Sequence, residues 1–146
     1  MPAHLLLSGA GLLLVLCLQL MTNNAQEDTN WKVLTMDLQM QSTAQAGEEV
    51  PVTLRIHTEI RECMVIKAYL RSSIPLEGPS HSYTFTACLC NDYPRTFFWD
   101  IVSNYTVTVV PIVDVVRELN ICPEDRAVMP IKANRFYTSA TLFITQ

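Results

Sequence analysis

The sequence predicts an all-β protein, an antiparallel β-sandwich of seven to eight short strands. Most segments after residue 25 alternate apolar and polar residues with a period of two, which is typical of strands with one buried face. Turn-forming residues separate these segments at short intervals, and no long helical repeat interrupts them. A closed barrel is the alternative, but Gly47 and Gly78 are few glycines for the tight corners of a barrel.

The first 25 residues are expected to be a secretory signal peptide that is removed. Leu12–Leu20 is an apolar run followed by polar residues, and it is too short for a transmembrane helix. Cleavage after Ala25 would leave Gln26 as the new N-terminus, where it can cyclise to pyrrolidone carboxylic acid. Residues 26–146 are then predicted to form one β-sandwich domain that is secreted into the extracellular space.

Charge and cysteine content narrow the possible partners and the compartment. The 14 acidic and 10 basic residues give a formal net charge of −4, and the two signs are interspersed without runs. This pattern argues against binding to nucleic acid or to an anionic membrane surface. Because Cys17 leaves with the signal peptide, four cysteines remain in the exported domain, and they are expected to form two disulfides.

The first half of the domain is predicted to contain three strands, at residues 31–40, 50–60 and 64–70. Of these, 50–60 has the clearest alternation of a half-buried strand. The polar segment 41–49, which contains Gly47, is predicted as a turn. Residues 72–82 contain two prolines and a glycine and are predicted as a loop.

The next strand lies within Tyr83–Asp92 and carries two of the cysteines. Tyr83, Phe85, Ala87 and Leu89 fall on one face, whereas Cys88 and Cys90 fall on the other. Residues i and i+2 of a strand have Cα atoms roughly 6.6 Å apart, at the limit of a disulfide, which disfavours a bond between these two cysteines. Each is therefore expected to bond to one of the remaining cysteines, Cys63 or Cys122, and the spacing leaves both assignments open.

The second half is predicted to contain the remaining strands. Residues 96–101 place Phe97, Trp99 and Ile101 on one face. Residues 105–116 are mostly β-branched, but Pro111 removes a ladder donor, so this strand is expected to lie at an edge, to bulge or to split. A helical turn is a second interpretation of 113–120. The remaining segments are a turn at 123–125 and strands at 127–131 and 135–144.

Seven motifs give the chain a family resemblance: Glu62–Val65, Ser72–Leu76, Thr86–Asp92, Pro94–Asp100, Val113–Leu119, Ile121–Pro123 and Pro130–Thr138. In these motifs the chain resembles the prolactin-inducible protein family, secreted glycoproteins of saliva, seminal plasma and other apocrine fluids. The resemblance covers most of the domain from about Glu59 onward and is weaker from Gln26 to Val50. It implies an immunoglobulin-like or fibronectin-type β-sandwich.

The resemblance also implies particular site residues and partners. It pairs Cys63 with Cys90 and Cys88 with Cys122, and it places an N-linked glycan on Asn104, which begins a valid Asn-Tyr-Thr acceptor. The implied partners are zinc alpha-2-glycoprotein, fibronectin, immunoglobulin and a T-cell surface co-receptor. An aspartyl-type peptidase activity, for which fibronectin would be a substrate, is also ascribed to the family.

The residues themselves favour binding over catalysis. An aspartic peptidase needs two carboxylates about 3 Å apart. The candidates Asp92, Asp100 and Asp114 are not accompanied by the glycine-containing loops that usually present such a pair. His57 and His81 lack the spacing to Cys88 and Cys90 that a zinc site needs, so neither a metal nor a cofactor is expected.

A lipid held between the two sheets is a third possibility, although Phe85, Phe97, Trp99 and Phe136 are more simply explained as core residues. The leading hypothesis is a secreted binding protein that uses its loops and sheet edges, with 105–110 or 50–60 as the edge strand. The same edges are expected to allow homo-oligomers.

Overall fold

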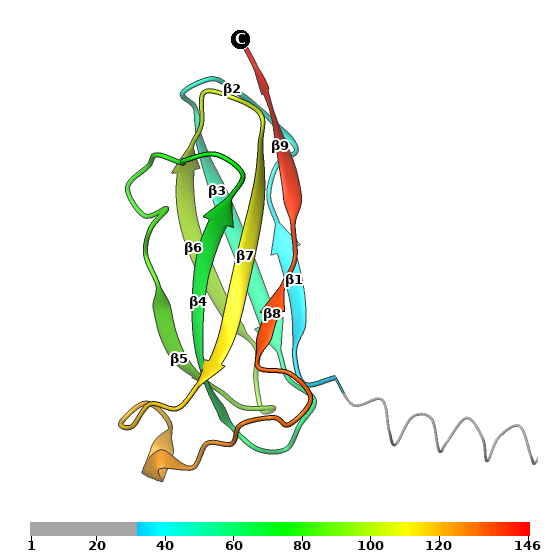
Figure 1. The fold of residues 1–146 in the computed structure, drawn as a ribbon, viewed down its shortest axis with the longest axis vertical. Helices are drawn as coiled ribbons and strands as arrows, with labels where there is room; N and C mark the ends of the chain where they lie inside the picture. Colours follow the sequence, from blue (N-terminus) through cyan, green and yellow to red (C-terminus); the bar gives the residue numbers. More distant parts are fainter. Residues whose placement is uncertain (1–31) are drawn as a thin grey trace, which may run out of the picture. The chain divides into compact units, whose positions relative to one another are not determined.

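Nine β-strands and one short 3₁₀ turn make up residues 32–146, the part of the chain that the computed structural model describes (Figure 1). The predicted signal peptide and Gln26 lie outside these described residues. The elements are β1 Thr35–Gln39, β2 Thr43–Gln45, β3 Glu49–His57, β4 Met64–Ser72, β5 Phe85–Leu89, β6 Arg95–Val102, β7 Val107–Val116, η1 Pro123–Asp125, β8 Arg135–Tyr137 and β9 Ala140–Thr145. No helix within 32–146 is long and apolar enough to cross a lipid bilayer.

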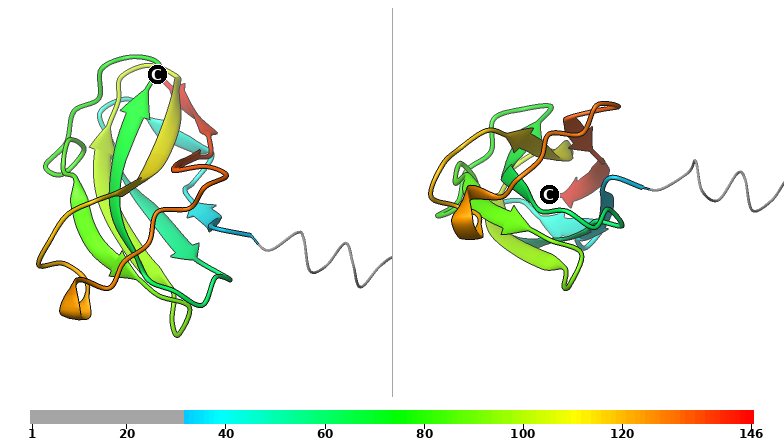
Figure 2. Two further views of the ribbon diagram at one scale, coloured as in Figure 1. Left: turned by 60° about the horizontal axis from the view of Figure 1, so that its bottom comes forward. Right: turned by 90° about the horizontal axis from the view of Figure 1, so that it is seen from below.

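The strands form two sheets, which confirms the predicted β-sandwich (Figures 1 and 2). One sheet has the order β1-β3-β6, and the other has the order β2-β9-β7-β4-β5, with β8 paired to β7 beside β9. All strand pairs are antiparallel except β2 with β9, which are parallel. The first two strands lie in different sheets, β1 in the smaller sheet and β2 in the larger one.

The space between the sheets is filled by the apolar faces that the alternation predicts. Phe97, Trp99 and Ile101 of β6 point inward, and Trp99 is only 1% exposed. The ring of Phe85 on β5 lies 5.1 Å from that of Phe97 and 5.4 Å from that of Trp99. The indole Nε1–H of Trp99 donates to the carbonyl of Tyr83 at 2.9 Å, so its one polar group is satisfied. Phe97 and Trp99 are thus core residues, with Phe85 packed against them.

Three segment predictions are wrong. Residues 43–45 were predicted as part of a turn but form β2, because buried Ala44 lets this polar segment pair with β9. Residues 127–131 were predicted as a strand but belong to no ladder; the Val128 N–H instead donates to the carbonyl of Cys63 at 2.9 Å. The single strand predicted at 135–144 is divided into β8 and β9.

Pro111 accounts for that division. It lies within the continuous strand β7, which is central rather than at an edge. The Thr138 N–H donates to the Pro111 carbonyl at 3.3 Å, so the backbone of Pro111 faces the β8–β9 side. In an antiparallel ladder the missing N–H of proline falls on the same side. The interruption predicted for β7 therefore occurs in its partner, between β8 and β9.

The edge strands also differ from those expected. Of the predicted segment 50–60, residues 50–57 lie in β3, between β1 and β6. Of the segment 105–110, residues 107–110 lie in β7, between β4 and β8–β9. Neither segment is therefore an edge of its sheet. The strands at the two ends of the larger sheet are β2, which pairs with β9, and β5, which pairs with β4.

Candidate functional site

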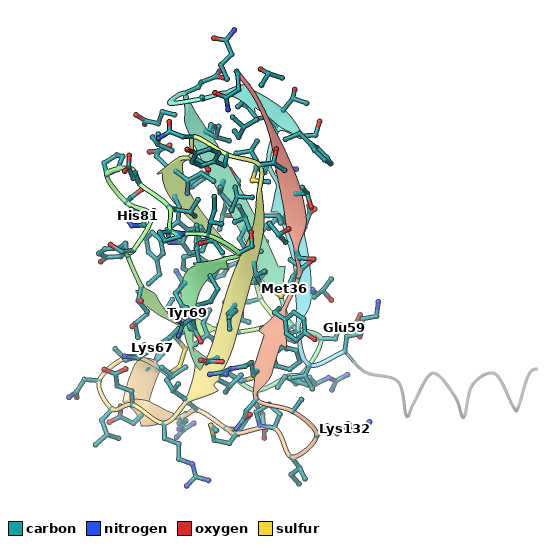
Figure 3. The ribbon with its side chains drawn as sticks, turned by 45° about the horizontal axis from the view of Figure 1, so that its top comes forward. Met36, Glu59, Lys67, Tyr69, His81 and Lys132 are labelled. Atoms are coloured by element: carbon teal, nitrogen blue, oxygen red, sulfur yellow. A yellow bond between two sulfur atoms is a disulfide. The ribbon has the colours of Figure 1, made fainter. Side chains whose placement is uncertain are left out.

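The outer face of the larger sheet carries a group of aromatic and charged side chains that we call the outer-face cluster: Tyr69, Arg71, Ile112, Asp114, Arg135 and Tyr137. Tyr69 and Arg71 come from β4, Ile112 and Asp114 from β7, and Arg135 and Tyr137 from β8. Strand register places Tyr69, Ile112 and Tyr137 in one row across the three strands. Tyr69 and its neighbour on the same face, Lys67, are labelled in Figure 3.

Asp114 holds the cluster together. Its Oδ2 accepts a hydrogen bond from the Tyr69 hydroxyl at 2.8 Å. Arg135 donates through Nε to Oδ1 at 2.7 Å and through Nη2 to Oδ2 at 3.1 Å, which is a bidentate pair. The Arg71 guanidinium carbon lies 5.5 Å from the centre of the Tyr69 ring, within cation–π distance. Four side chains from three strands are thus held in one arrangement.

The electrostatics of the cluster oppose acid–base catalysis by Asp114. The hydrogen bond from Arg135 lowers the pKa of Asp114, partial burial opposes this, and the bond from Tyr69 lowers it further. Burial, followed by the hydrogen bond to Asp114, raises the pKa of Tyr69. At neutral pH the carboxylate is ionised and the phenol keeps its proton. The cluster is therefore a fixed set of charges and donors rather than a proton-transfer site.

The cluster presents contact chemistry to solvent. Tyr137 is 71% exposed, and Arg71 and Arg135 are also exposed. Lys67 and Glu118 form an ion pair of 3.2 Å beside it, at its rim. Tyrosine and arginine are enriched at the energetic centres of protein interfaces, whereas lysine and glutamate are typical of the rim. Among the described residues this arrangement resembles a protein-binding surface.

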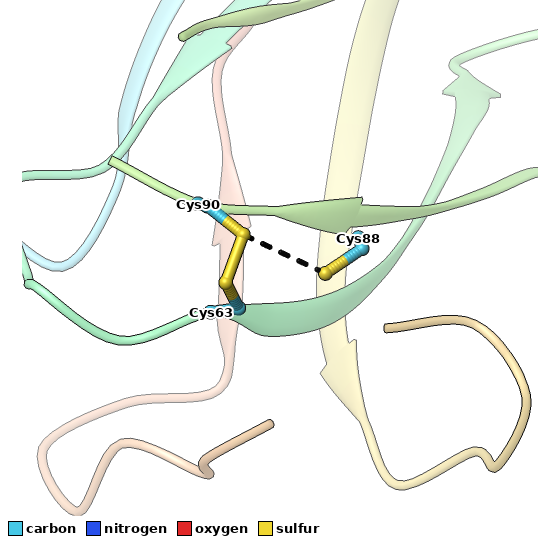
Figure 4. Close-up of side chains that lie close together, drawn as sticks. All are labelled: Cys63, Cys88 and Cys90. Carbon is cyan, nitrogen blue, oxygen red and sulfur yellow. Dashed lines mark hydrogen bonds between the residues drawn. A yellow bond between two sulfur atoms is a disulfide. The ribbon is translucent and has the colours of Figure 1, made fainter. Parts of the chain in front are cut away.

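The two disulfides lie together at one end of β4 and β5. Cys63 is bonded to Cys90 and Cys88 to Cys122, the same pairing that the family resemblance implies. The Sγ atoms of Cys88 and Cys90 are 3.8 Å apart (Figure 4), and since both sulfurs are oxidised this is a van der Waals contact. Three of the sulfurs lie within 4.8 Å of one another, but disulfide sulfurs provide no thiolate for a metal.

The Cys88–Cys122 bond fastens the connection between β7 and β8 to the sheet. This connection, residues 117–134, runs across the lower end of the larger sheet (Figure 2, orange). Under it, Val65, Cys88 and Cys122 are buried in a small second core, with Val116 and Ile121 packed against them. The Cys88–Cys122 disulfide therefore fixes the position of the β7–β8 connection next to the outer-face cluster.

The other candidate residues lie apart from one another. Asp100 lies on β6 of the smaller sheet and points away from the core, since its neighbours Trp99 and Ile101 point inward. Asp114 is on the outer face of the opposite sheet, so the core separates the two carboxylates. Asp92 lies in the exposed β5–β6 loop. This geometry gives no support to a shared-proton dyad of Asp100 and Asp114.

The histidines also stay apart from the cysteines. His57 is exposed on β3, and His81 donates through Nδ1 to the Gly78 carbonyl at 2.8 Å in the loop before β5. Asn104 lies at the other end of the sandwich, in the exposed turn between β6 and β7. Its backbone carbonyl accepts a hydrogen bond from the Gln146 side chain at 3.1 Å, a contact that does not involve the side-chain amide to which a sugar would be attached.

Sequence reasoning missed most of the outer-face cluster. It considered Asp114 only as a possible catalytic acid and gave no role to Tyr69, Arg71, Arg135 or Tyr137. One signal was available: Lys67, Tyr69 and Arg71 alternate with the apolar residues of their strand and share its outward face. The sequence does not show which residues of other strands lie beside them.

Comparison with known proteins identifies related chains. The family model of seminal vesicle autoantigen (SVA) matches residues 3–125. A prolactin-inducible protein homolog of Oryctolagus cuniculus is 63% identical over 130 residues, covering 89% of this chain and 88% of the relative. The Bos taurus homolog is 58% identical over 142 residues (95% and 97%), and the Homo sapiens prolactin-inducible protein is 53% identical over 131 residues (90% and 88%).

One solved structure is closely similar. It is the crystal structure of the complex formed between zinc 2-glycoprotein and prolactin inducible protein from human seminal plasma. The similar chain is 47% identical, superposes with a TM-score of 0.76, and the match covers 80% of this chain and 98% of that chain. This agreement supports the β-sandwich described above.

Proposed function

We propose that this chain, which belongs to the seminal vesicle autoantigen family and to the prolactin-inducible proteins, is a secreted protein that binds a partner resembling zinc 2-glycoprotein. The observation that carries this proposal is the complex formed by the 47% identical human relative. Seminal plasma as the source of that complex, together with the two disulfides of this chain, supports an extracellular location.

We further propose that the outer-face cluster is the contact surface. Its row of Tyr69, Ile112 and Tyr137 offers apolar area, and Arg71 and Arg135 offer donors on either side of that row. Asp114 fixes two of these side chains in advance, so little side-chain entropy is lost on binding. A pre-organised Tyr–Arg surface with a charged rim has the composition of an interface centre.

Glycosylation of Asn104 is compatible with this surface. Asn104 lies in the turn at the upper end of β7, whereas Asp114 and Arg135 lie towards the lower end (Figure 1). A sugar at the upper end would leave the cluster accessible. Fibronectin, immunoglobulin and the T-cell surface co-receptor stay predictions from the family resemblance, as does the ascribed peptidase activity.

Surface plasmon resonance with purified zinc 2-glycoprotein tests both parts of the proposal. We expect Tyr137→Ala and Arg71→Glu each to weaken binding about tenfold or more, as at an interface hot spot. The matched control is Phe98→Ala, which removes a 62% exposed aromatic ring from the outer face of the opposite sheet. Absence of binding by the unmodified chain would contradict the function. Binding that depends on Phe98 alone would retain the function and reject the surface.

A further inference from the structure

Strand β5 leaves one side of the larger sheet without a neighbour in the part of the chain that the structure describes. Two kinds of residue pair alternate along an antiparallel ladder. In a narrow pair the Cα atoms are about 4.5 Å apart and the backbone N–H and C=O groups point away from the partner strand, whereas in a wide pair they are about 5.5 Å apart and the two residues share two hydrogen bonds. The Cα atoms of Cys63 and Cys90 are 4.2 Å apart, which is the narrow spacing. Counting along the β4–β5 register, the pairs of Cys88 with Val65 and of Thr86 with Lys67 are then also narrow.

A second observation gives the same orientation. Arg95, the first residue of β6, donates through Nε to the Cys88 carbonyl at 3.0 Å, so this carbonyl points away from β4. The guanidinium of Arg95 also lies 4.9 Å from the centre of the Tyr93 ring. By the alternation of the ladder, the N–H and C=O of Thr86 and the N–H of Cys88 share the free edge. Within residues 32–146 these three groups have no backbone or side-chain partner.

We propose that this free edge pairs with the β5 strand of a second copy of the chain, in antiparallel register about a two-fold axis at Thr86. In that register the two Thr86 residues exchange two hydrogen bonds, and the Cys88 N–H of each copy donates to the Thr84 carbonyl of the other. The dimer goes beyond the proposed binding of a different protein, because it uses the edge of the sheet instead of its face.

The side chains of β5 argue for a second copy as the occupant. With Thr86 on the axis, Phe85 of one copy lies opposite Ala87 of the other on the inner face. Both residues are half-buried in the single chain, so each has apolar surface left to cover. The two-fold axis creates this contact of Phe85 with Ala87 twice, so the edge is complementary in shape to a second copy of itself.

Arg95 limits this association. While its Nε holds the Cys88 carbonyl, the Thr84 N–H of the second copy has no acceptor there, and two of the six possible hydrogen bonds of the dimer are lost. A charged side chain placed on an edge is a common protection against strand pairing. Self-association is accordingly weak in the unmodified chain and becomes stronger when Arg95 is removed.

Sedimentation equilibrium of the full exported chain over concentrations up to the millimolar range tests the proposal. We expect a monomer–dimer equilibrium that Arg95→Ala tightens about tenfold or more, the effect of releasing two acceptors. The matched control, Arg55→Ala, removes the same charge from an exposed residue of β3 in the smaller sheet, and leaves the equilibrium unchanged. Thr86→Pro abolishes the dimer, and because the Thr86 N–H points away from β4, no ladder bond within the chain is lost.

Cross-linking gives an independent measurement that does not require proline. Two Thr86 residues facing each other as a wide pair have Cα atoms about 5.5 Å apart, within the range of a disulfide. Thr86→Cys should therefore form an intermolecular cross-link, seen on a non-reducing gel and located by peptide mapping. Thr84→Cys should not, because two Thr84 residues lie about 13 Å apart in this register.

Three results would overturn the proposal: a monomer at every concentration for both the unmodified chain and Arg95→Ala, a dimer that persists in folded Thr86→Pro, or equal cross-linking by the two cysteine variants. Circular dichroism and peptide mapping of the two native disulfides establish that each variant is folded. Loss of zinc 2-glycoprotein binding alone would count against the proposed function and not against this dimer.

Discussion

Removal of the Cys88–Cys122 disulfide tests how the chain holds the long β7–β8 connection on its sheet. The perturbation is the double substitution Cys88→Ala with Cys122→Ala, which leaves no free thiol from this pair. The bond closes a sequence separation of 34 residues, for which the chain-entropy model gives about 4 kcal/mol of stabilisation. Both cysteines are buried, at 7% and 5% exposure, so the lost packing adds about 1 kcal/mol.

A loss of about 5 kcal/mol is a large share of the 5–15 kcal/mol that is typical of a folded domain. It corresponds to a decrease of about 20 °C in melting temperature for a domain of this size. Urea unfolding followed by circular dichroism measures the free energy directly. The matched control is Cys63→Ala with Cys90→Ala, whose separation of 27 residues gives an entropic term only a few tenths of a kcal/mol smaller.

The two double variants should differ in local protection rather than in loop entropy. Cys88–Cys122 holds residues 117–134, whereas Cys63–Cys90 joins two strands that already pair through β4 and β5. Trypsin should therefore cleave after the exposed Arg126 faster in the first variant than in the second. If the first variant loses less than about 1 kcal/mol, or if cleavage at Arg126 is unchanged, the reasoning is refuted. The connection would then be held by contacts such as the Val128 N–H to Cys63 carbonyl bond.

Three further predictions concern single residues. The pKa of Asp114 is lowered in the folded protein, so its ionised form stabilises the fold at neutral pH, and this contribution is lost as the pH falls below the ordinary value of 3.8 and through the lowered pKa. Asp114→Asn should cost about 1 kcal/mol in urea unfolding at pH 7 and much less near pH 2, since the partner Arg135 is 63% exposed; an equal cost at both pH values would contradict the ion pair. Gly78→Ala should destabilise the domain by about 2 kcal/mol or more in thermal unfolding, because a Cβ atom would lie 2.6 Å from the Asp100 carbonyl oxygen and φ is +118°. A melting temperature like that of the unmodified chain would show that the loop moves freely from β6. The secreted chain should show a gel mobility shift on treatment with a glycosidase, and Asn104→Gln should remove the shift; a chain that does not respond carries no such glycan.

The parts of the fold that depend on local pattern were predictable. The inward faces of β3 and β6 follow directly from alternation, since Val50, Val52, Phe97 and Trp99 repeat every second residue and are all buried. The parts of the fold that depend on which strands pair with one another were not predictable. The order of the strands makes β3 and β7 central, and no local signal in their sequences distinguishes a central strand from an edge strand that is half-buried.

The same distinction explains why the outer-face cluster was missed. Asp114 bonds to Tyr69 across a separation of 45 residues and to Arg135 across 21 residues. Each of these side chains, taken alone, is an ordinary polar residue on the outward face of a strand. Only the register of three strands brings them together, and register depends on the whole set of long-range pairings. The cysteine pairs show the converse, because the family resemblance supplied a long-range pairing that the spacing alone left open.

The face and the edge of the larger sheet can be occupied at the same time, because the outer-face cluster and the β5 edge share no residue. A two-fold axis at Thr86 stands perpendicular to the joined sheet, so both clusters of a dimer face the same side. We therefore expect light scattering after size-exclusion chromatography to give a two-to-two complex of Arg95→Ala with zinc 2-glycoprotein, and a one-to-one complex for Thr86→Pro with unchanged affinity per site. Loss of partner binding in folded Thr86→Pro would show instead that the partner contact extends to β5, because Thr86 lies in the same outward row as Lys67 and Asp114 but is not part of the outer-face cluster.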